Sequence, residues 1–463
     1  MADAKRETGA DTGHDLPPGM LEWVAATGGG RVARLERHVA RREAWLVDVE
    51  RADGSLLEGF LRLEREPVPN NPWSLAKETQ IVAALDRAGI PVATVYGRSD
   101  ELRCSLFRRV PGRSDLDKLE DGRQQRAVMQ DFMRVLARIH GLPLSELGLD
   151  AAMAYHPKSA EEAALGEIDL VLAQWRPFLR SYSDPLLSFG LDWLRRSVPL
   201  PLARVSLVQG DTGPMNFVFE GDRVAAVVDW EWGHYGDPME DLGNLCVREF
   251  WNPSGGLTGL FELYERESGI PYSRAAAAYY RVQQNVRGMV GIHAATLQPR
   301  AREPVSWFLA YRYIGDRATC EALAFALGLE VARPELPDDA GAGDALAEAA
   351  RHALLHDVEP ALAAAPFARS RAQDARILVE VMERRRRFGA MLEKLECEEL
   401  GALLGRRPAS LAAGLEALDA AIRKRSLADD AVVPYLCRRA WRDEWLHAPT
   451  LALYPDRRWS AID

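Results

Sequence analysis

The chain has 463 residues, 47% of them hydrophobic, so we expect two or three domains with substantial cores. Its formal net charge of −10 argues against a general nucleic-acid-binding protein held by phosphate contacts, while a local charge cluster still allows an anionic small substrate. The five cysteines lie far apart with no CxxC pair, which indicates a reducing compartment and argues against a disulfide framework or a zinc site.

The first 20 residues, "MADAKRETGADTGHDLPPGM", are polar and lack an apolar core, so we expect a disordered tail over 1–20 rather than a signal peptide. No apolar run approaches the roughly eighteen residues that a membrane span needs. The sequence therefore predicts a cytoplasmic protein that binds neither membrane nor nucleic acid, and it leaves the oligomeric state open.

Strand patterns follow the tail. Residues 31–65 contain "RVARLERH", "AWLVDVE" and "LLEGFLRLE", and Asp53-Gly54 is typical of the turn in a β-hairpin. The segment "NNPWSLAKETQIVAALDRAGI" predicts a helix capped by Ser74, and "ELRCSLFRRVPG" predicts a further strand. This order predicts a small, mostly antiparallel lobe over residues 21–115.

The rest of the chain is mainly helical in pattern. Residues 116–332 contain several amphipathic helical stretches, interrupted by two short strands, "NFVF" and "AAVVDW", that are joined by the turn "EGDR". Residues 333–345, "RPELPDDAGAGDA", are rich in Pro, Gly and Asp and predict a linker. Four further amphipathic patterns predict a helical bundle over residues 346–463.

The chemistry is concentrated in residues 207–245, "LVQGDTGPMNFVFEGDRVAAVVDWEWGHYGDPMEDLGNL". Phosphoryl transfer needs a carboxylate to accept or orient the attacking hydroxyl, oxygen ligands for Mg²⁺ and a cation beside the phosphates. Asp211 and Asn216 have the D-x-x-x-x-N spacing of a kinase catalytic loop, and Asp229 follows a hairpin that would bring it back beside Asn216. The alternative is that Asp211 and Asn216 only shape a turn.

Other polar residues near this segment have structural interpretations. Asp237, followed by Pro238, and Asp241 are typical of the start of a helix. His140 ends an amphipathic helix, where packing or an interaction with the helix dipole is expected. His234 lies close after Asp229 and is a candidate for substrate contact that no other feature supports.

The segments "VQGDTGPMNF" and "VVDWEWGHYGDPMEDLGNL" resemble the aminoglycoside phosphotransferase/choline kinase family. The subgroup most similar to this chain is the kinase domain joined to some acyl-CoA dehydrogenases, with its stand-alone bacterial relatives. The resemblance covers about residues 21–330 and implies an α+β, two-lobed protein-kinase-like fold with ATP and Mg²⁺ in its cleft. It implies that Asp211 is the catalytic base and that Asn216 and Asp229 are the metal ligands.

The resemblance also implies nucleotide-binding residues in the first lobe. Arg62 of "GFLRLE" matches the phosphate-binding cation and Glu78 its ion-pair partner, although such a pair can also be a weak surface salt bridge. The phosphate loop departs from the family pattern: "HVARREAW" has side chains where glycines are expected, and Arg41 and Arg42 would compensate with charge.

One further departure and one further domain bear on activity. Gln209 replaces the His that precedes the catalytic loop, while keeping hydrogen-bonding capacity. The C-terminal part, about residues 344–463, resembles through "DALAEAARHALLHDVEPAL" and "DARILVEVMERRRR" a small helical domain found beside such kinases in bacteria, which suggests a stimulating or substrate-presenting module. The run Arg384–Arg387 is expected to be a solvated helix face or, alternatively, a contact for a phosphate-rich handle such as that of coenzyme A.

The sequence therefore predicts a small-molecule kinase that uses ATP and Mg²⁺ to phosphorylate a hydroxyl group, with a hydroxyacyl-CoA as the favoured substrate. An aminoglycoside or other antibiotic kinase is the alternative within the same chemistry. A pseudokinase or binding module without turnover is the alternative of a different class, prompted by Gln209 and the glycine-poor loop.

Overall fold

The computed structural model describes residues 16–38, 43–64, 71–299, 304–339, 343–460 and 462. The chain divides into two compact units. The first unit contains the residues up to His156 with Ala203–Asp241 and Thr258–Tyr272, and the second contains Pro157–Leu202, Leu242–Leu257 and the chain from Ser273 onward.

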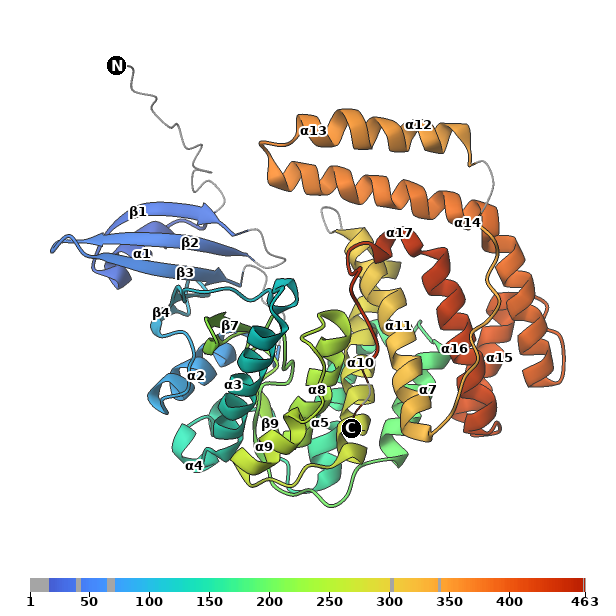
Figure 1. Cartoon of the computed structure of the whole chain (residues 1–463), viewed down its shortest axis with the longest axis horizontal. Helices are drawn as coiled ribbons and strands as arrows, with labels where there is room; N and C mark the ends of the chain where they lie inside the picture. The colour runs from blue at the N-terminus through green and yellow to red at the C-terminus, as the bar shows by residue number, and fades with distance from the viewer. Residues whose placement is uncertain are drawn as a thin grey trace. The chain divides into compact units, whose positions relative to one another are not determined.

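The first unit begins with a five-stranded antiparallel sheet in the order β1-β2-β3-β5-β4 (Figure 1). Its strands are β1 (Gly30–Arg37), β2 (Ala44–Arg51), β3 (Leu56–Leu63), β4 (Val95–Ser99) and β5 (Cys104–Arg108). The hairpin predicted at Asp53-Gly54 is confirmed, because β2 and β3 pair across this turn and Gly54 takes a φ of 79° there.

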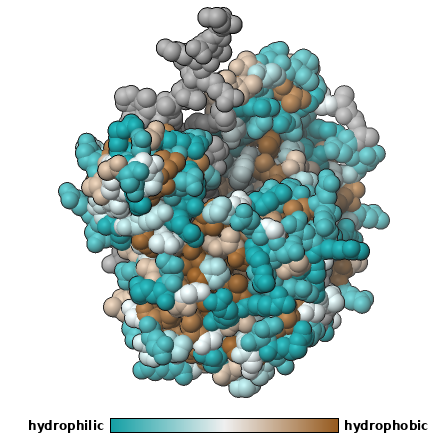
Figure 2. Space-filling view, turned by 60° about the vertical axis from the view of Figure 1, so that its left-hand side comes forward, coloured by the Kyte–Doolittle hydropathy of each residue, from teal (hydrophilic) through white to brown (hydrophobic). Residues whose placement is uncertain are grey.

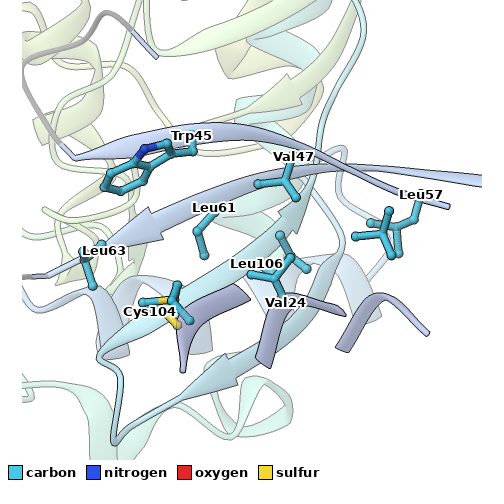
Figure 3. Close-up of a cluster of buried hydrophobic side chains, with 10 residues drawn as sticks. Val24, Trp45, Val47, Leu57, Leu61, Leu63, Cys104 and Leu106 are labelled. Carbon is cyan, nitrogen blue, oxygen red and sulfur yellow. The ribbon is translucent and has the colours of Figure 1, made fainter. Parts of the chain in front are cut away.

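One face of this sheet is covered by a helix that the sequence analysis did not predict. The helix α1 (Met20–Gly28) begins inside the segment expected to be a tail, of which residues 1–15 lie outside the described ranges. Met20 and Val24 are fully buried in a cluster that includes Val47 and Leu106 from the sheet (Figure 3). A helix of nine residues is too short to be stable alone, so packing on the sheet accounts for it.

The two long helices of the first unit match their predictions. In α2 (Leu75–Arg87), the Ser74 hydroxyl accepts a hydrogen bond from the backbone N–H of Lys77 at 3.3 Å, as expected of an N-cap. In α3 (Gly122–Gly141), the apolar stripe that includes Phe132 and Leu136 is buried.

Short strands and helices complete the first unit. Strand β6 (Ser206–Val208) pairs with β9 (His234–Gly236), and β7 (Phe217–Glu220) pairs with β8 (Arg223–Val227). The helices α4 (Leu144–Leu147), α9 (Leu260–Ser268) and the first turn of α8 (Pro238–Trp251) also belong to it. The two predicted strands "NFVF" and "AAVVDW" are therefore present, and their pairing positions the candidate site.

The second unit is helical. It contains α5 (Ala160–Gln174), α6 (Arg176–Leu179), α7 (Pro185–Arg196), the rest of α8, α10 (Arg274–Leu297), α11 (Val305–Leu327), α12 (Ala345–Ala353), α13 (Glu359–Ala361), α14 (Pro366–Leu404), α15 (Leu411–Arg423), α16 (Asp429–Leu446) and α17 (Ala448–Leu451). The predicted C-terminal helices are present, and α12 lies alongside α14 (Figure 1).

These C-terminal helices pack on helices from earlier in the chain. The helix α16 packs on α11, where the Cys437 thiol donates to the backbone oxygen of Cys320 at 3.5 Å. Described residues of the expected linker, 333–339, form neither helix nor strand. Residues 345–463 thus share one compact unit with helices between 157 and 327, and the domain boundaries drawn from the sequence stay a prediction.

Among the described residues, no helix combines the length and the apolar character that crossing a bilayer requires. Hydrophilic side chains cover most of the face visible in Figure 2, and hydrophobic ones form patches between them.

Candidate active site

The loop between β6 and β7 is fixed by one buried carboxylate. Asp241, in the first turn of α8, accepts hydrogen bonds from the backbone N–H groups of Gln209 and Gly210, both at 2.9 Å. Its Oδ2 also lies 3.0 Å from Nε2 of His140, whose Nδ1 lies 2.7 Å from the Tyr264 hydroxyl. Because Asp211 follows Gly210 directly, these contacts determine where Asp211 lies.

Asp241 is charged in this setting. Burial by itself would raise its pKa, but the hydrogen bond and the charge of His140, together with the backbone hydrogen bond from Gln209, outweigh burial and lower the pKa of Asp241 below its ordinary value. A fully buried carboxylate held in this way is a rigid anchor for the loop.

Backbone strain accompanies the loop. Gly210 has a φ of 77°, and a Cβ atom at this position would lie 2.6 Å from the backbone oxygen of Trp232, so only glycine fits. Met215 and Asp229 also have positive φ, 75° and 60°, although neither is glycine. Non-glycine residues in this region are strained and occur preferentially at functional sites, which marks the segment as one.

Asp211 and Asn216 lie in direct contact. The Asn216 Nδ2 atom donates to the backbone oxygen of Asp211 at 2.6 Å and to its Oδ2 at 3.0 Å. Asn216 is 5% exposed, so its side chain is held in place. These two hydrogen bonds use only the amide nitrogen, and an amide oxygen such as Oδ1 is a ligand that a hard cation accepts.

The hairpin of β7 and β8 brings Asn216 beside Asp229, as the sequence analysis predicted. Phe217 pairs with Val227, and the backbone N–H of Val228 donates to the backbone oxygen of Asn216 at 2.9 Å. Asp229 is the next residue after Val228. Asn216 and Asp229, which carry an amide oxygen and a carboxylate, thus lie at the same end of the strand pair.

Gln209 links the two halves of this arrangement. Its Nε2 atom donates to the backbone oxygen of Val228 at 2.6 Å, directly before Asp229. Gln209 is 1% exposed. The residue that replaces the family's His therefore holds the strand end that carries Asp229 against the loop that carries Asp211.

The donor set fits Mg²⁺. Amide and carboxylate oxygens are the hard ligands that Mg²⁺ prefers, and Mg²⁺ commonly completes its shell with phosphate oxygens and water. Within the described ranges, no group of three His, Cys, Asp or Glu side chains could hold a metal by itself. An ion held by Asn216 and Asp229 would therefore depend on ligands that the nucleotide supplies.

The expected ion pair of the sheet is present. Arg62 of β3 pairs with Glu78 of α2, and their side chains are 15% and 4% exposed. Such burial distinguishes the pair from an exposed salt bridge of little energy. The other two candidate nucleotide contacts, Arg41 and Arg42, lie outside the described residues.

The structure shows the contacts of two neighbouring residues, His234 and Asp237. His234 is buried, with Nδ1 2.8 Å from the Trp232 oxygen and Nε2 3.1 Å from Glu240, so it is fixed within the fold. These contacts give His234 a structural role. Asp237 does begin the helix, because its Oδ1 accepts from the backbone N–H of Met239 at 2.9 Å.

All four arginines of the run Arg384–Arg387 form ion pairs or hydrogen bonds within the second unit. Arg384 pairs with Asp339, and its Nη2 donates to the Trp445 oxygen at 2.9 Å. Arg385 donates to His447 at 3.0 Å, Arg386 pairs with Glu383 at 2.8 Å, and Arg387 pairs with Asp339 at 3.2 Å. The run is therefore more than a solvated face, and these partners compete with any phosphate ligand.

Sequence reasoning missed two contributors to the site. It treated Asp241 as a helix-start residue, whereas the structure also makes it the anchor of the loop. It also missed Trp73, whose ring centroid lies 4.7 Å from that of Trp232 and so connects the start of α2 to the segment after Asp229. The only local signal for either was the density of acidic and aromatic residues in 229–241.

Comparison with known proteins agrees with this geometry. The model of the family described as "Phosphotransferase enzyme family" matches residues 39–279. Acyl-CoA dehydrogenase family member 10 of Mus musculus is 29% identical over 214 residues, which is 43% of this chain and 19% of that protein. Acyl-CoA dehydrogenase family member 11 of Rattus norvegicus is 25% identical over 224 residues, 44% of this chain and 27% of that protein. The match thus spans only about a fifth to a quarter of each relative's length.

Among solved structures, a candidate aminoglycoside phosphotransferase from Ralstonia eutropha JMP134 has a TM-score of 0.53 and 20% sequence identity. The similarity covers 67% of this chain and 97% of that one. At this identity the likeness concerns the fold, and it agrees with the α+β, kinase-like architecture expected from the sequence.

Proposed function

The chain belongs to the phosphotransferase enzyme family and is a small-molecule kinase of the aminoglycoside phosphotransferase/choline kinase type, and from this premise we propose that it transfers a phosphoryl group from ATP to the hydroxyl of a hydroxyacyl-CoA. The observation that carries the proposal is the hairpin that sets Asn216 and Asp229 side by side next to Asp211. A pair of oxygen ligands beside a carboxylate is what phosphoryl transfer requires.

Each of these side chains has a role in the proposed reaction. Asp211 accepts the proton of the attacking hydroxyl, and Asn216 holds the Asp211 carboxylate through Nδ2. The Asn216 amide oxygen and Asp229 would hold Mg²⁺, which would offset the charge of the β- and γ-phosphates. Arg62, oriented by Glu78, steadies the phosphates.

The position of Gln209 supports an active kinase rather than a pseudokinase. A scaffold residue at this place must hold the strand end that carries Asp229, and the Nε2 of Gln209 donates to the Val228 oxygen at 2.6 Å. The replacement of His thus keeps a positioning hydrogen bond. This contact favours the kinase over the pseudokinase alternative.

The substrate class rests on the curated relatives. Their names connect them to acyl-CoA chemistry, and the matched region in this chain covers 43% and 44% of it. We propose a hydroxyacyl thioester of coenzyme A because a kinase acting beside acyl-CoA metabolism would need a hydroxyl on such a substrate. An aminoglycoside is the alternative, and the fold likeness alone does not favour it.

The test is transfer of phosphate from [γ-³²P]ATP with Mg²⁺ to a panel of hydroxyacyl-CoAs of different chain lengths and to a panel of aminoglycosides. Labelling of an acyl-CoA is the expected result. Asp211→Asn should lower kcat by roughly 100- to 10,000-fold, because general-base catalysis contributes about that much. Asp53→Asn, in an exposed turn, is the matched control and should keep the wild-type rate.

Three results would contradict the proposal. Labelling of aminoglycosides alone would replace the substrate class while keeping the chemistry. An Asp211→Asn enzyme as fast as the wild type would remove Asp211 as the base. Binding of ATP with Mg²⁺, seen as a thermal shift, without transfer to any hydroxyl would favour the pseudokinase.

A further inference from the structure

A cavity of about 640 Å³ lies in the first unit and includes none of the candidate active-site residues in its wall. Its wall comes from the end of α2 and the loop that follows it, the end of β5, the second half of α3 and the start of β8. The volume falls within the range of pockets that bind small molecules, about 300–1,000 Å³.

The wall is rich in arginine. It contains Arg108, Arg134, Arg138 and Arg223, against two carboxylates, Asp86 and Asp131, so its formal charge is +2. This local charge is opposite in sign to the −10 of the whole chain. Four guanidinium groups around one small cavity are typical of a site for phosphate oxygens, because each presents several N–H donors in a fixed plane.

One carboxylate of the wall is already neutralised. Asp131 is 7% exposed, pairs with Arg223 at 2.6 Å and accepts the backbone N–H of Val224 at 2.9 Å. This pair fixes the start of β8 against α3. Asp131 therefore does not cancel the charge of the remaining arginines.

Those three arginines keep donors available. Arg138 donates to a neutral backbone oxygen, that of Gly89, at 2.6 Å, and Arg134 lies 3.6 Å from Glu267 with its side chain 45% exposed. Within the ranges that the structure describes, the exposed Arg108 side chain at the end of β5 has no ion pair and no hydrogen bond. A dianionic or more highly charged ligand would satisfy these donors together.

We propose that this cavity binds a small molecule carrying two or more phosphate groups, at a site separate from the candidate metal ligands. The site is connected to them through the backbone. The N–H of Val227 donates to the oxygen of Pro91, a wall residue, at 2.8 Å, and Val227 lies two residues before Asp229. A ligand here thus lies against the strand that positions Asp229, which suits an effector rather than the phosphoryl donor.

The test is isothermal titration with inorganic pyrophosphate of the full-length protein saturated with Mg²⁺ and a non-hydrolysable ATP analogue. Saturation keeps the probe out of the nucleotide site. We expect binding that weakens roughly 10-fold or more in Arg108→Gln and further in Arg108→Gln/Arg138→Gln, since each charged hydrogen bond is worth about that factor. Arg123→Gln, an exposed arginine at the start of α3 outside the cavity, is the matched control and should keep the wild-type Kd.

The proposal is overturned if Arg108→Gln binds pyrophosphate as tightly as the wild type, or if Arg123→Gln loses as much affinity as Arg108→Gln. Loss of all binding on adding the ATP analogue would also overturn it, because the probe would then occupy the nucleotide site. Arg108→Gln changes an exposed side chain, so we expect the variant to fold normally. An unchanged Tm checks this. Asp211→Asn should still bind pyrophosphate, so failure of the proposed kinase activity and failure of this site are distinguishable.

Discussion

Asp241 in the first unit and Glu399 in the second are held in different ways. In the first unit, the buried Asp241 carboxylate accepts from the backbone N–H groups of Gln209 and Gly210, and its Oδ2 lies 3.0 Å from Nε2 of His140. In the second unit, the half-buried Glu399 carboxylate accepts two hydrogen bonds from the buried Arg442 side chain, at 2.9 and 3.1 Å. The Asp241 charge thus positions a loop, whereas the charges of Arg442 and Glu399 join two helices.

This difference has a physical reason. Backbone N–H groups have fixed directions, so a carboxylate that binds two of them fixes a loop closely, as a catalytic segment requires. Arginine side chains are long, and their planar donors reach between helices that are far apart in sequence. In the second unit such contacts connect α14 and α16, through Arg442 with Glu396 and Glu399. We therefore expect substitutions in the first unit to affect activity and those in the second to affect stability.

The largest effect on stability is expected for Arg442→Met. Its side chain is 3% exposed, and its loss removes two charged hydrogen bonds to Glu399 and leaves the buried Glu396 with Arg439 as its ion-pair partner, which costs about 3 kcal/mol. Urea unfolding measures this, and the kcat of the protein that remains folded should be unchanged. Arg438→Met, which removes a 32% exposed arginine from the same Glu399, is the control and should cost under about 1 kcal/mol. A fall in kcat for Arg442→Met would break the division between the units.

Asp241→Asn is expected to lower both activity and stability. Asparagine has one acceptor oxygen, so the N–H of Gln209 or of Gly210 is left without its acceptor, at a cost of about 1–3 kcal/mol. Displacement of Asp211 by the relaxed loop should lower kcat roughly 100-fold. Steady-state kinetics with denaturant unfolding separates the two effects. A wild-type kcat in this variant would mean that the loop keeps its geometry without the anchor.

His447 should make the second unit sensitive to acid. Burial, and then the nearby positive charge of Arg385, lower the pKa of His447 to about 3, while its ring lies stacked on Tyr313 with centroids 3.6 Å apart. The folded state therefore keeps His447 neutral. Its contribution is fully present above the unfolded pKa of about 6.5 and is lost as the pH falls, by about 2 kcal/mol at pH 5.

Comparing wild type with His447→Gln between pH 7.5 and pH 5 measures this contribution. Denaturant unfolding of the variant should show a flatter pH dependence than the wild type. His352→Gln, which changes an exposed histidine in the same unit, should leave the wild-type slope. Equal slopes in wild type and His447→Gln would show that this histidine does not titrate differently in the folded and unfolded states.

The smallest effect is expected for the coupling of Arg62 and Glu78. A double-mutant cycle with Arg62→Ala and Glu78→Ala should give a coupling energy of about 1.5 kcal/mol in the apparent binding of ATP. The physical reason is that both side chains are largely buried, so each single change removes a poorly screened charge contact from the other. Additive effects would assign the pair to the structure of the first unit rather than to nucleotide binding.

The sequence by itself determined the local parts of this protein. The Ser74 cap, the Asp53-Gly54 turn and the hairpin that joins Asn216 to Asp229 depend on contacts between residues close in the chain, and each is found in the structure. Spacing and turn chemistry express such contacts directly, so they can be read without coordinates. The family motif added the expected ion pair of Arg62 with Glu78, which also is present.

Only the tertiary structure decided which distant residues meet. Asp241 lies about thirty residues after the loop that it anchors, and no periodicity links the two. The arginines of the cavity come from separate elements, and α1 becomes stable only by packing on the sheet. The type of a side chain determines which groups it can bond to. Which of these groups lies near it depends on how the chain closes its long loops, and therefore on the packing of all the elements together.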